Sequence, residues 1–376
     1  MSGIRKFSLQ HCDLSSSMGN VAFLMKALTL KIAVRDAKPI LFIFYILTFM
    51  CGVCYFYVYL VSMIWFVFCR CPETGDLLAA LIVFSLGIAS EISTVKFLCM
   101  YVYIDDIRSM VTECLSCDSK VAPGRFSKNL LRPLREVKKR AIVFWIVIIG
   151  NGMMYVIKPI LLPGRHLMDD MLVLYGLEPM FETPNYQISF FMMAASDCLI
   201  CYLTANISSF LIIITGYIQA QMLALSEELT HLWNDAEENF LQTGSETIDD
   251  DLEDNDAAKD ATYILNNYVK VYLKDITKRH DTFRGAIATE FCLLIIALIA
   301  ELLCGLENTY MEIPFMLMQV GMDCLIGQRV MDAGTVFEQA VYDCKWERLN
   351  RKNMKSVFMA IIKSIYSTYT TLRSTL

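Results

Sequence analysis

The sequence is poor in charge. Only 19% of its 376 residues are Asp, Glu, Lys or Arg, whereas a soluble domain has about 25%. The charges are also absent from long stretches, and residues 40–69 carry none. An uncharged apolar run of about 18 residues or more is typical of a transmembrane helix, because about 20 residues of helix cross the hydrocarbon core. The scarcity of charge therefore excludes an ordinary soluble domain and predicts an integral membrane protein.

The sequence also lacks the residue patterns of common enzymes. Its four histidines lie in separate polar segments, and it has no Gly-x-x-x-x-Gly-Lys-Ser/Thr, no His-Glu-x-x-His and no Gly-x-Ser-x-Gly. Most of its fourteen cysteines lie in apolar runs or in polar segments predicted below to be cytosolic, so they do not indicate a disulfide framework. We expect a protein that is not an enzyme and that has no cofactor, no bound metal and no nucleic-acid partner.

Seven apolar segments are long enough to be membrane spans. They are residues 40–69, 77–104, 141–162, 188–222, 285–306, 310–330 and 356–376. The fourth is longer than a bilayer requires, so its end should continue into water as a helix. The last is the weakest, because it contains Lys363, Arg373 and many hydroxyl groups. The sequence therefore predicts an all-α membrane protein with seven transmembrane helices.

The segments between the spans alternate in basic charge. Counted from the N-terminus, they contain six, one, nine, one, six, zero and five Lys or Arg residues. The richest includes "GRFSKNLLRPLREVKKR" at 124–140, which has seven. Because basic loops remain in the cytoplasm, the N-terminus should be cytoplasmic and the C-terminus extracellular. A G-protein-coupled receptor has the opposite orientation and is excluded.

This topology divides the chain into six regions. The first two are a cytoplasmic N-terminal segment, 1–39, and spans one to four, 40–222. A cytoplasmic loop with anchor helices and an acidic insert follows at 223–284. The remaining regions are spans five and six at 285–330, a cytoplasmic segment at 331–355 and the seventh span at 356–376.

Acidic residues inside the predicted spans are candidates for function. Asp197, Glu301 and Asp323 are the strongest, because intramembrane charges often mark a ligand contact or a coupling relay. Polar contacts between helices would explain the same residues. Glu91 and Lys96 lie about 140° apart around a helix, so we do not expect them to pair with each other.

Two further patterns concern a cavity and a pore. Spans two, three, four and six carry aromatic residues and methionines in their outer halves, which suits an adaptable apolar cavity as well as ordinary packing. In the last span, Ser367, Thr371, Ser374 and Thr375 share one helical stripe. Such a stripe favours a water-filled pore, although hydrogen bonds between helices would also use it.

Three stretches carry a resemblance to a known family. They are "MLALSEELTHLWNDAEENF" after span four, "MDCLIGQRVMDAGTVFEQAVYDCKWERLNRKN" from span six and "IKSIYSTYTTLRSTL" at the end of the chain. Together they resemble insect odorant receptors, and "YGLEPMFETPNYQISF" is similar to lepidopteran members that tune the response to odorants. The resemblance implies the odorant-tuning subunit of a ligand-gated cation channel, working as a hetero-tetramer with an odorant co-receptor. It also implies a place in the plasma membrane of sensory-neuron dendrites and a small volatile odorant or pheromone as ligand.

The resemblance also assigns roles to residues. It implies a ligand-binding pocket of Phe84, Ile88, Gly152, Tyr155, Met193, Asp197, Phe315 and Met318. It places Thr371, Ser374 and Thr375 in the pore. One departure is that only nineteen residues separate Trp346 from Tyr366, fewer than in the family. A non-conducting truncated variant and a gustatory receptor-like channel therefore remain alternatives, whereas a transporter would show an inverted repeat that we do not find.

Overall fold

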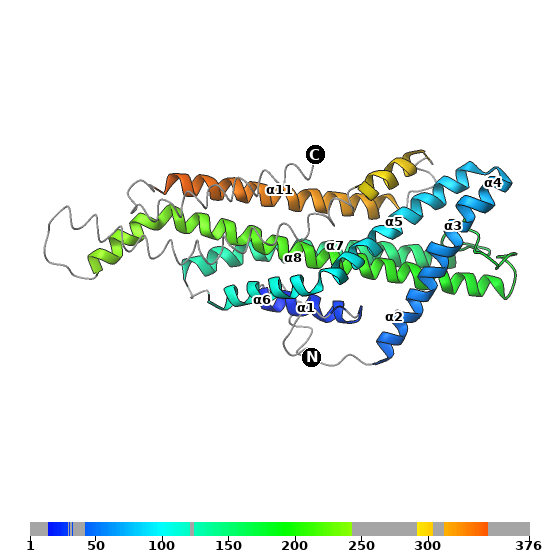
Figure 1. Ribbon diagram of the computed structural model, residues 1–376, viewed down its shortest axis with the longest axis horizontal. Coiled ribbons are helices and arrows are strands. Elements are labelled where there is room, and N and C mark those ends of the chain that lie inside the picture. The colour runs from blue at the N-terminus through cyan, green and yellow to red at the C-terminus, as the bar shows by residue number, and fades with distance from the viewer. Residues whose placement is uncertain are drawn as a thin grey trace.

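The computed structural model describes residues 14–28, 30, 32, 42–120, 124–242, 292–303 and 312–344. Every regular element in these ranges is a helix, which confirms the predicted all-α class for this part of the chain. Figure 1 shows an elongated molecule in which the longest helices run side by side along the long axis, with α8 at the centre.

The first predicted span is one continuous helical run. It consists of α2 (Phe42–Tyr55), η2 (Phe56–Ser62), α3 (Met63–Trp65), η3 (Phe66–Arg70) and α4 (Cys71–Thr74). The elements η2 and η3 are π-helical, so the backbone is locally wider there. Gly75 ends the run with a φ of 74°, a left-handed conformation that glycine adopts without strain.

The second run begins directly afterwards. Asp76 caps α5 (Leu77–Val102) by accepting a hydrogen bond of 3.1 Å from the Ala79 N–H. The helix α6 (Ile104–Lys120) continues from α5 after a single residue. It is much more polar than α5, and this change fits the predicted passage from membrane to water.

The basic segment at 124–140 is helical and forms the first part of α7 (Arg125–Leu161). From the sequence, this segment was only a basic connection between spans two and three, and no helix was predicted in it. Its apolar residues explain the difference, since Phe126, Leu130, Leu134 and Val137 recur at helical spacing and are all buried. The predicted extension of span four is confirmed, because α8 runs from Asn185 to Gln242 over 58 residues.

Four of the described helical runs are long and apolar enough to cross a membrane: Phe42–Thr74, Leu77–Val102, Arg125–Leu161 and the Asn185–Asp235 part of α8. A shorter apolar helix, Cys292–Leu303, lies within the predicted fifth span. The predicted sixth span corresponds to the first part of α11 (Ile313–Asp343). Residues 356–376 lie outside the described residues, so the count of seven spans stays a prediction.

One helix was missed in the sequence. The helix α1 (Leu14–Lys26) lies within the predicted N-terminal segment and packs against α6 and α8. The spacing of its buried residues Leu14, Met18, Val21 and Met25 was the signal that could have revealed it. The Tyr202 hydroxyl on α8 donates a hydrogen bond of 2.9 Å to the Leu24 carbonyl oxygen and holds α1 in place.

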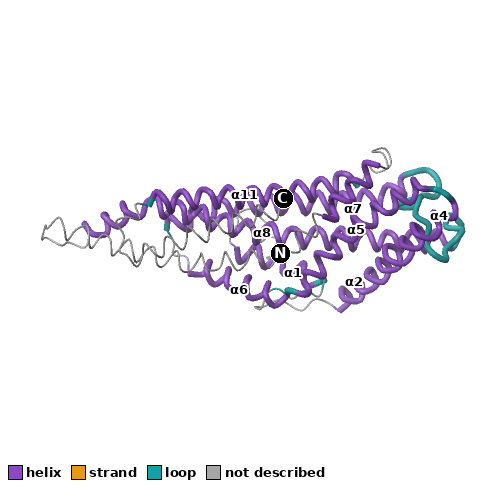
Figure 2. Tube along the Cα trace, turned by 45° about the horizontal axis from the view of Figure 1, so that its top comes forward, coloured by secondary structure: helices purple, strands orange, loops and turns teal. Residues whose placement is uncertain are grey.

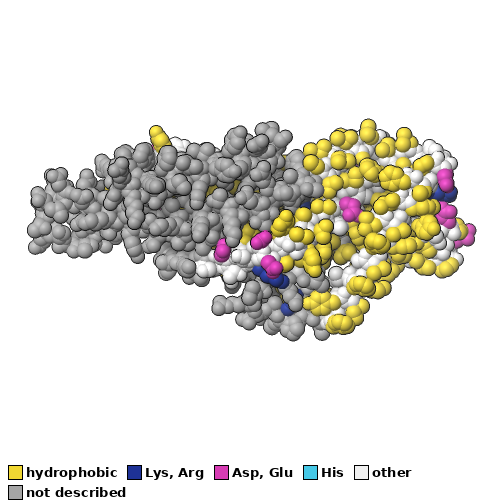
Figure 3. Space-filling view, in the orientation of Figure 1, with side chains coloured by type: hydrophobic (Ala, Val, Ile, Leu, Met, Phe, Trp, Pro, Cys, Tyr) yellow, Lys and Arg dark blue, Asp and Glu magenta, His cyan; other side chains and the backbone are white. Residues whose placement is uncertain are grey.

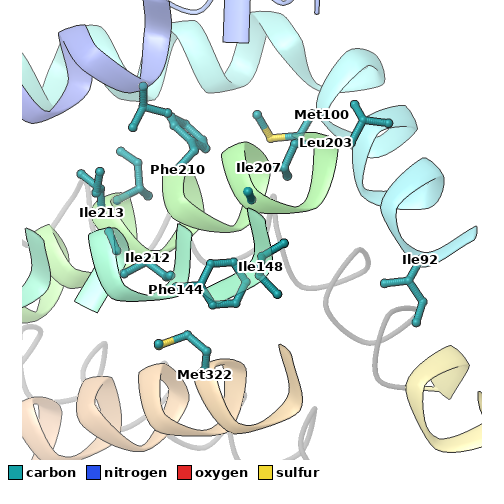
Figure 4. Close-up of a cluster of buried hydrophobic side chains, with 14 of the residues drawn as sticks. Ile92, Met100, Phe144, Ile148, Leu203, Ile207, Phe210, Ile212, Ile213 and Met322 are labelled. Atoms are coloured by element: carbon teal, nitrogen blue, oxygen red, sulfur yellow. The ribbon is translucent and has the colours of Figure 1, made fainter. Parts of the chain in front are cut away.

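The core lies along the contact of α7 with α8. Figure 4 shows Phe144 and Ile148 of α7 facing α8, with Met322 of α11 on the other side. The helices α7 and α8 approach each other closely at Gly216 of α8, where a Cβ atom would stand 2.4 Å from a methyl carbon of Val137 on α7. The loops joining α4 to α5 and α7 to α8 gather at one end of the molecule (Figure 2). On the face drawn in Figure 3, hydrophobic side chains cover most of this part of the molecule, with an acidic side chain among them and a few charges at the tip.

Candidate ligand-binding cavity

A cavity lies among five helical segments near the loop end of the molecule. Its lining residues come from η2, α5, α7, α8 and the start of α11 and are Tyr59, Leu86, Ala89, Ser90, Asn151, Gly152, Tyr155, Asp197, Ile200, Cys201, Glu312 and Phe315. The walls enclose about 490 Å³ of space free of protein atoms, including the opening. Its lining combines apolar side chains with a few polar groups, which is the character of pockets for small organic ligands.

Asp197 is the acid on the α8 wall. It is 7% exposed, and its Oδ1 atom accepts a hydrogen bond from the Tyr59 hydroxyl of η2. Its second oxygen, Oδ2, is buried and has no hydrogen-bond partner. The helix α8 therefore presents a half-satisfied carboxyl group to the cavity, and η2 holds that group in one orientation.

Glu312 supplies a second carboxyl group, at the start of α11. It is 8% exposed, and its Oε2 atom is also buried without a partner. Glu301, on the helix Cys292–Leu303, lies against it and is 1% exposed. Neither oxygen of Glu301 receives a hydrogen bond from a donor group. Two carboxylates side by side repel each other, so this pair requires a proton or a positive charge to be stable.

Gly152 determines how closely α7 and α8 approach at the cavity. A Cβ atom there would stand 2.4 Å from Cys201 Sγ and 2.9 Å from Cys201 Cβ. Both residues line the cavity. Any larger residue at 152 would therefore force Cys201 to move and would change the shape of the wall.

The α7–α8 loop borders the same site. Burial raises the pKa of the Asp169 carboxyl group, which interacts electrostatically with Lys158. The Oδ1 atom of Asp169 accepts a hydrogen bond of 2.9 Å from the Met171 N–H. The charge of Asp169 also acts on Asp197 and Glu312, so this loop acid lies close to the two cavity carboxyl groups.

Contacts with the first span hold this loop in place. The Tyr57 hydroxyl donates a hydrogen bond to the Tyr175 carbonyl oxygen, and the Tyr175 N–H donates one of 3.2 Å to Ser62 Oγ. Arg70 and Glu178 form an ion pair of 3.3 Å. Both η2 and η3 therefore contact the α7–α8 loop, which the sequence did not indicate, and η2 also supplies Tyr59 to the cavity lining.

The eight predicted pocket residues divide into two groups. Gly152, Tyr155, Asp197 and Phe315 line the cavity, whereas Phe84, Ile88, Met193 and Met318 do not. Helical geometry accounts for the second group. On α5 the lining residues are Leu86, Ala89 and Ser90, so Phe84 and Ile88 point to other sides of the helix. Met193 and Met318 each lie one turn from a lining residue of their own helix and pack against the core.

The other intramembrane charges have separate positions. Glu91 accepts a hydrogen bond of 2.7 Å from the Tyr55 hydroxyl, and Lys96 donates one of 3.0 Å to Ser208 Oγ. These two residues therefore have different partners, as their spacing predicted. Asp323 does not line the cavity. The predicted pore residues Thr371, Ser374 and Thr375 lie outside the described residues.

Sequence reasoning missed most of the lining, including Tyr59 and Glu312. Tyr59 carries a hydroxyl group within an uncharged run of thirty residues. Glu312 carries a carboxyl group at the predicted start of span six. Each is a polar group at an apolar position, which was the signal that could have found it.

Comparisons with known proteins agree with this arrangement. The structure is similar to that of the insect olfactory receptor OR5 from Machilis hrabei, with a TM-score of 0.67 and 10% identity over 92% of this chain and 87% of that one. The chain has the fold of an insect olfactory receptor. The complex of the same receptor with eugenol gives a TM-score of 0.65 and 11% identity over 94% of this chain and 90% of that one.

No protein-family model matches the chain, and no curated protein matches it by sequence. The two solved structures are olfactory receptors rather than enzymes, in agreement with the expectation from the sequence.

Proposed function

We propose that this chain is the odorant-tuning subunit of a ligand-gated cation channel in olfactory neurons. The observation that carries the proposal is the cavity between five helical segments in a chain with the olfactory-receptor fold. A receptor of this fold has been solved with a small aromatic volatile, eugenol. Four of the described helical runs are long and apolar enough to span a bilayer, which supports a place in a membrane. We propose that this membrane is the plasma membrane of the sensory dendrite.

The proposed mechanism couples occupancy of the cavity to the pore. An apolar volatile gains about 25 cal/mol for each Å² of surface removed from water, which for a small molecule gives an affinity in the micromolar range. Binding can open the channel only by the difference in affinity between the closed and open states. The cavity contacts α8 and α11, whose far ends are joined by a hydrogen bond of 2.6 Å from Trp233 Nε1 to the Cys344 carbonyl oxygen. These two helices offer a route from the cavity to the rest of the channel.

The direct test is expression of the full chain with an odorant co-receptor subunit, followed by recording of current while volatiles are applied. We expect inward cation current that needs both subunits, and substitution of Thr371 or Thr375 should change ion permeability. Absence of current at full surface expression of both subunits would contradict the proposal.

The short segment between Trp346 and Tyr366 favours a second candidate, a subunit that binds odorant but does not conduct. Insertion of the corresponding segment from a longer homologue distinguishes the two functions. Current that appears only after insertion supports the non-conducting variant, whereas unchanged current supports the channel subunit.

A further inference from the structure

The cavity contains hydrogen-bond acceptors that lack donors. Asp197 Oδ2 and Glu312 Oε2 are both buried, both belong to lining residues and neither has a hydrogen-bond partner. A buried carboxyl oxygen without a partner costs several kcal/mol if it is ionised. A buried carboxyl group avoids this cost by holding a proton, or a bound molecule supplies the missing donor.

The surrounding charge has the same sign. Glu301 lies against Glu312, and Asp169 interacts electrostatically with both Glu312 and Asp197. The lining residues include no Lys, Arg or His. Lys158 acts on the loop acid Asp169 and is not part of the lining. The cavity therefore offers two carboxyl groups with no basic side chain in its wall.

The described residues contain no group of three His, Cys, Asp or Glu side chains arranged to hold a metal ion. The remaining lining is largely apolar, with Leu86, Ala89, Ile200 and Phe315. This combination suits an organic molecule with an apolar body and a charged donor at one end. A primary ammonium group carries three N–H donors and one positive charge, whereas a hydroxyl group donates only one hydrogen bond.

We propose that the cavity recognises small aliphatic primary amines, bound as ammonium ions between Asp197 and Glu312. The ammonium donates hydrogen bonds to Asp197 Oδ2 and Glu312 Oε2, and the alkyl chain lies against the apolar wall. The Tyr59 hydroxyl holds Oδ1 of Asp197 and so leaves Oδ2 for the ligand. This inference names the ligand class of the proposed odorant cavity and therefore rests on that proposed function.

The test compares three probes with the same carbon chain: hexan-1-amine, hexan-1-ol and hexanal. At pH 7.4 the amine is an ammonium ion, because the pKa of an alkylamine is about 10. Purified full-length chain in lipid nanodiscs is titrated with each probe while its thermal unfolding is followed. We expect hexan-1-amine to bind about tenfold or more tightly than hexan-1-ol, which corresponds to a charge-assisted hydrogen bond. N-hexylacetamide keeps the nitrogen without the charge and should bind as weakly as the alcohol.

Variants assign the effect to the two carboxyl groups. Asp197→Asn and Glu312→Gln keep the shape of each side chain and remove its charge, and each should weaken hexan-1-amine binding about tenfold while changing hexan-1-ol binding little. Glu182→Gln is the matched control, because Glu182 is an exposed acid of the α7–α8 loop outside the lining. If a variant fails to fold, the comparison of the four probes on the unchanged chain still decides the question.

The outcomes separate this inference from the proposed function. Equal or tighter binding of hexan-1-ol or hexanal would overturn the amine assignment, as would retention of amine affinity in the doubly substituted chain. A wild-type channel that responds to neutral volatiles but not to amines would overturn it too, while leaving the odorant-receptor function standing. Tight amine binding without current from any volatile would support the ligand class and contradict the channel function.

Discussion

The polar groups at the two ends of the α7–α8 pair differ in whether they have partners within the chain. At the end far from the cavity, Arg125 at the start of α7 binds Glu228 at 2.8 Å and also Asp235, both on α8. These hydrogen bonds raise the pKa of the Arg125 guanidinium group, which therefore stays charged. The Trp233 indole donates its hydrogen bond to the end of α11. Arg125 and Trp233 thus find their partners within the chain.

At the cavity end, carboxyl oxygens of Asp197, Glu301 and Glu312 are buried without donors. Of these acids, Asp197 lies on α8, whereas Glu301 and Glu312 come from the neighbouring helix Cys292–Leu303 and the start of α11. This end encloses a cavity and adjoins a loop, which is where a ligand can supply what is missing. This contrast supports the proposal that the cavity end binds a ligand, while the far end holds the helices together.

The sharpest test of this contrast uses two glycines that bring α7 and α8 together. In Gly216→Ala the new methyl group would meet the Val137 side chain at 2.4 and 2.5 Å, and a β-branched side chain cannot easily turn away. We expect a loss of stability of about 1–3 kcal/mol. In Gly152→Ala, rotation of Cys201 relieves the contact with Sγ but not the contact of 2.9 Å with Cβ, so this variant should also lose stability, and its change in ligand affinity should be the larger of the two. Thermal unfolding and ligand titration of both variants measure the difference.

Gly150→Ala is the control, because a Cβ atom at Gly150 meets nothing within 4 Å. It should be neutral or stabilise the helix by up to about 1 kcal/mol. If Gly216→Ala were no more destabilising than Gly150→Ala, the close contact at the far end would not contribute to stability.

Trp233→Phe examines the far end without changing the cavity. It leaves the Cys344 carbonyl oxygen without its donor, and Cys344 is buried. We expect a loss of about 1–3 kcal/mol in the free energy of unfolding, with ligand affinity unchanged in the purified chain. A change in ligand affinity larger than the change in stability would show that the two ends are not independent.

Arg125→Lys should have a smaller effect. Lysine keeps the charge but cannot bind two carboxylates with a planar fork. Because the Arg125 side chain is 37% exposed, solvent screens the ion pairs, and we expect a loss of only about 0.5–1 kcal/mol. Chemical unfolding of Arg125→Lys beside Arg132→Lys, an exchange at an exposed arginine of the same helix, measures it. Equal stability of the two variants would show that this contact does not help to hold α7 on α8.

The sequence predicted the parts of the fold that depend on long apolar runs. An uncharged segment such as 40–69 has few alternatives to a helix in a bilayer, and the extension of α8 followed from its length. The sequence did not reveal that 124–140 is helical, because its charges and Pro133 masked a buried stripe of four residues. The short helix α1 was missed for a similar reason, since its stripe is surrounded by serines and other small residues.

The cavity was harder to predict, because it depends on the rotation of each helix about its own axis. Phe84 and Leu86 are two residues apart on α5 and point to nearly opposite sides, and only Leu86 lines the cavity. Residue type favoured the aromatic Phe84 as a pocket residue, whereas the rotation of the helix about its axis places the aliphatic Leu86 in the lining. Asp197 was identified because a charge inside a span is costly, so residue type alone was informative there. Tyr59 carries no charge, so its hydroxyl group in an apolar run was a weaker signal than the charge of Asp197.

The smallest effect should come from the exposed side of the α7–α8 loop. Asp170 accepts a hydrogen bond of 2.9 Å from His166 Nδ1 and raises the pKa of that imidazole above its usual value of about 6.5. A raised pKa in the folded state stabilises the fold below about pH 6.5, and this contribution is lost as the pH rises through the folded-state value.

Asp170→Asn keeps an oxygen for the Leu167 N–H, which donates a hydrogen bond of 2.7 Å to Asp170 Oδ1, and removes the charge. The unfolding temperature of the unchanged chain should therefore exceed that of Asp170→Asn slightly at pH 5.5, and the two should converge by pH 8. A difference that stays constant over this range would show that the His166–Asp170 pair does not titrate as a unit. Because both residues are solvated, any effect should be far smaller than at the buried carboxyl groups of the cavity.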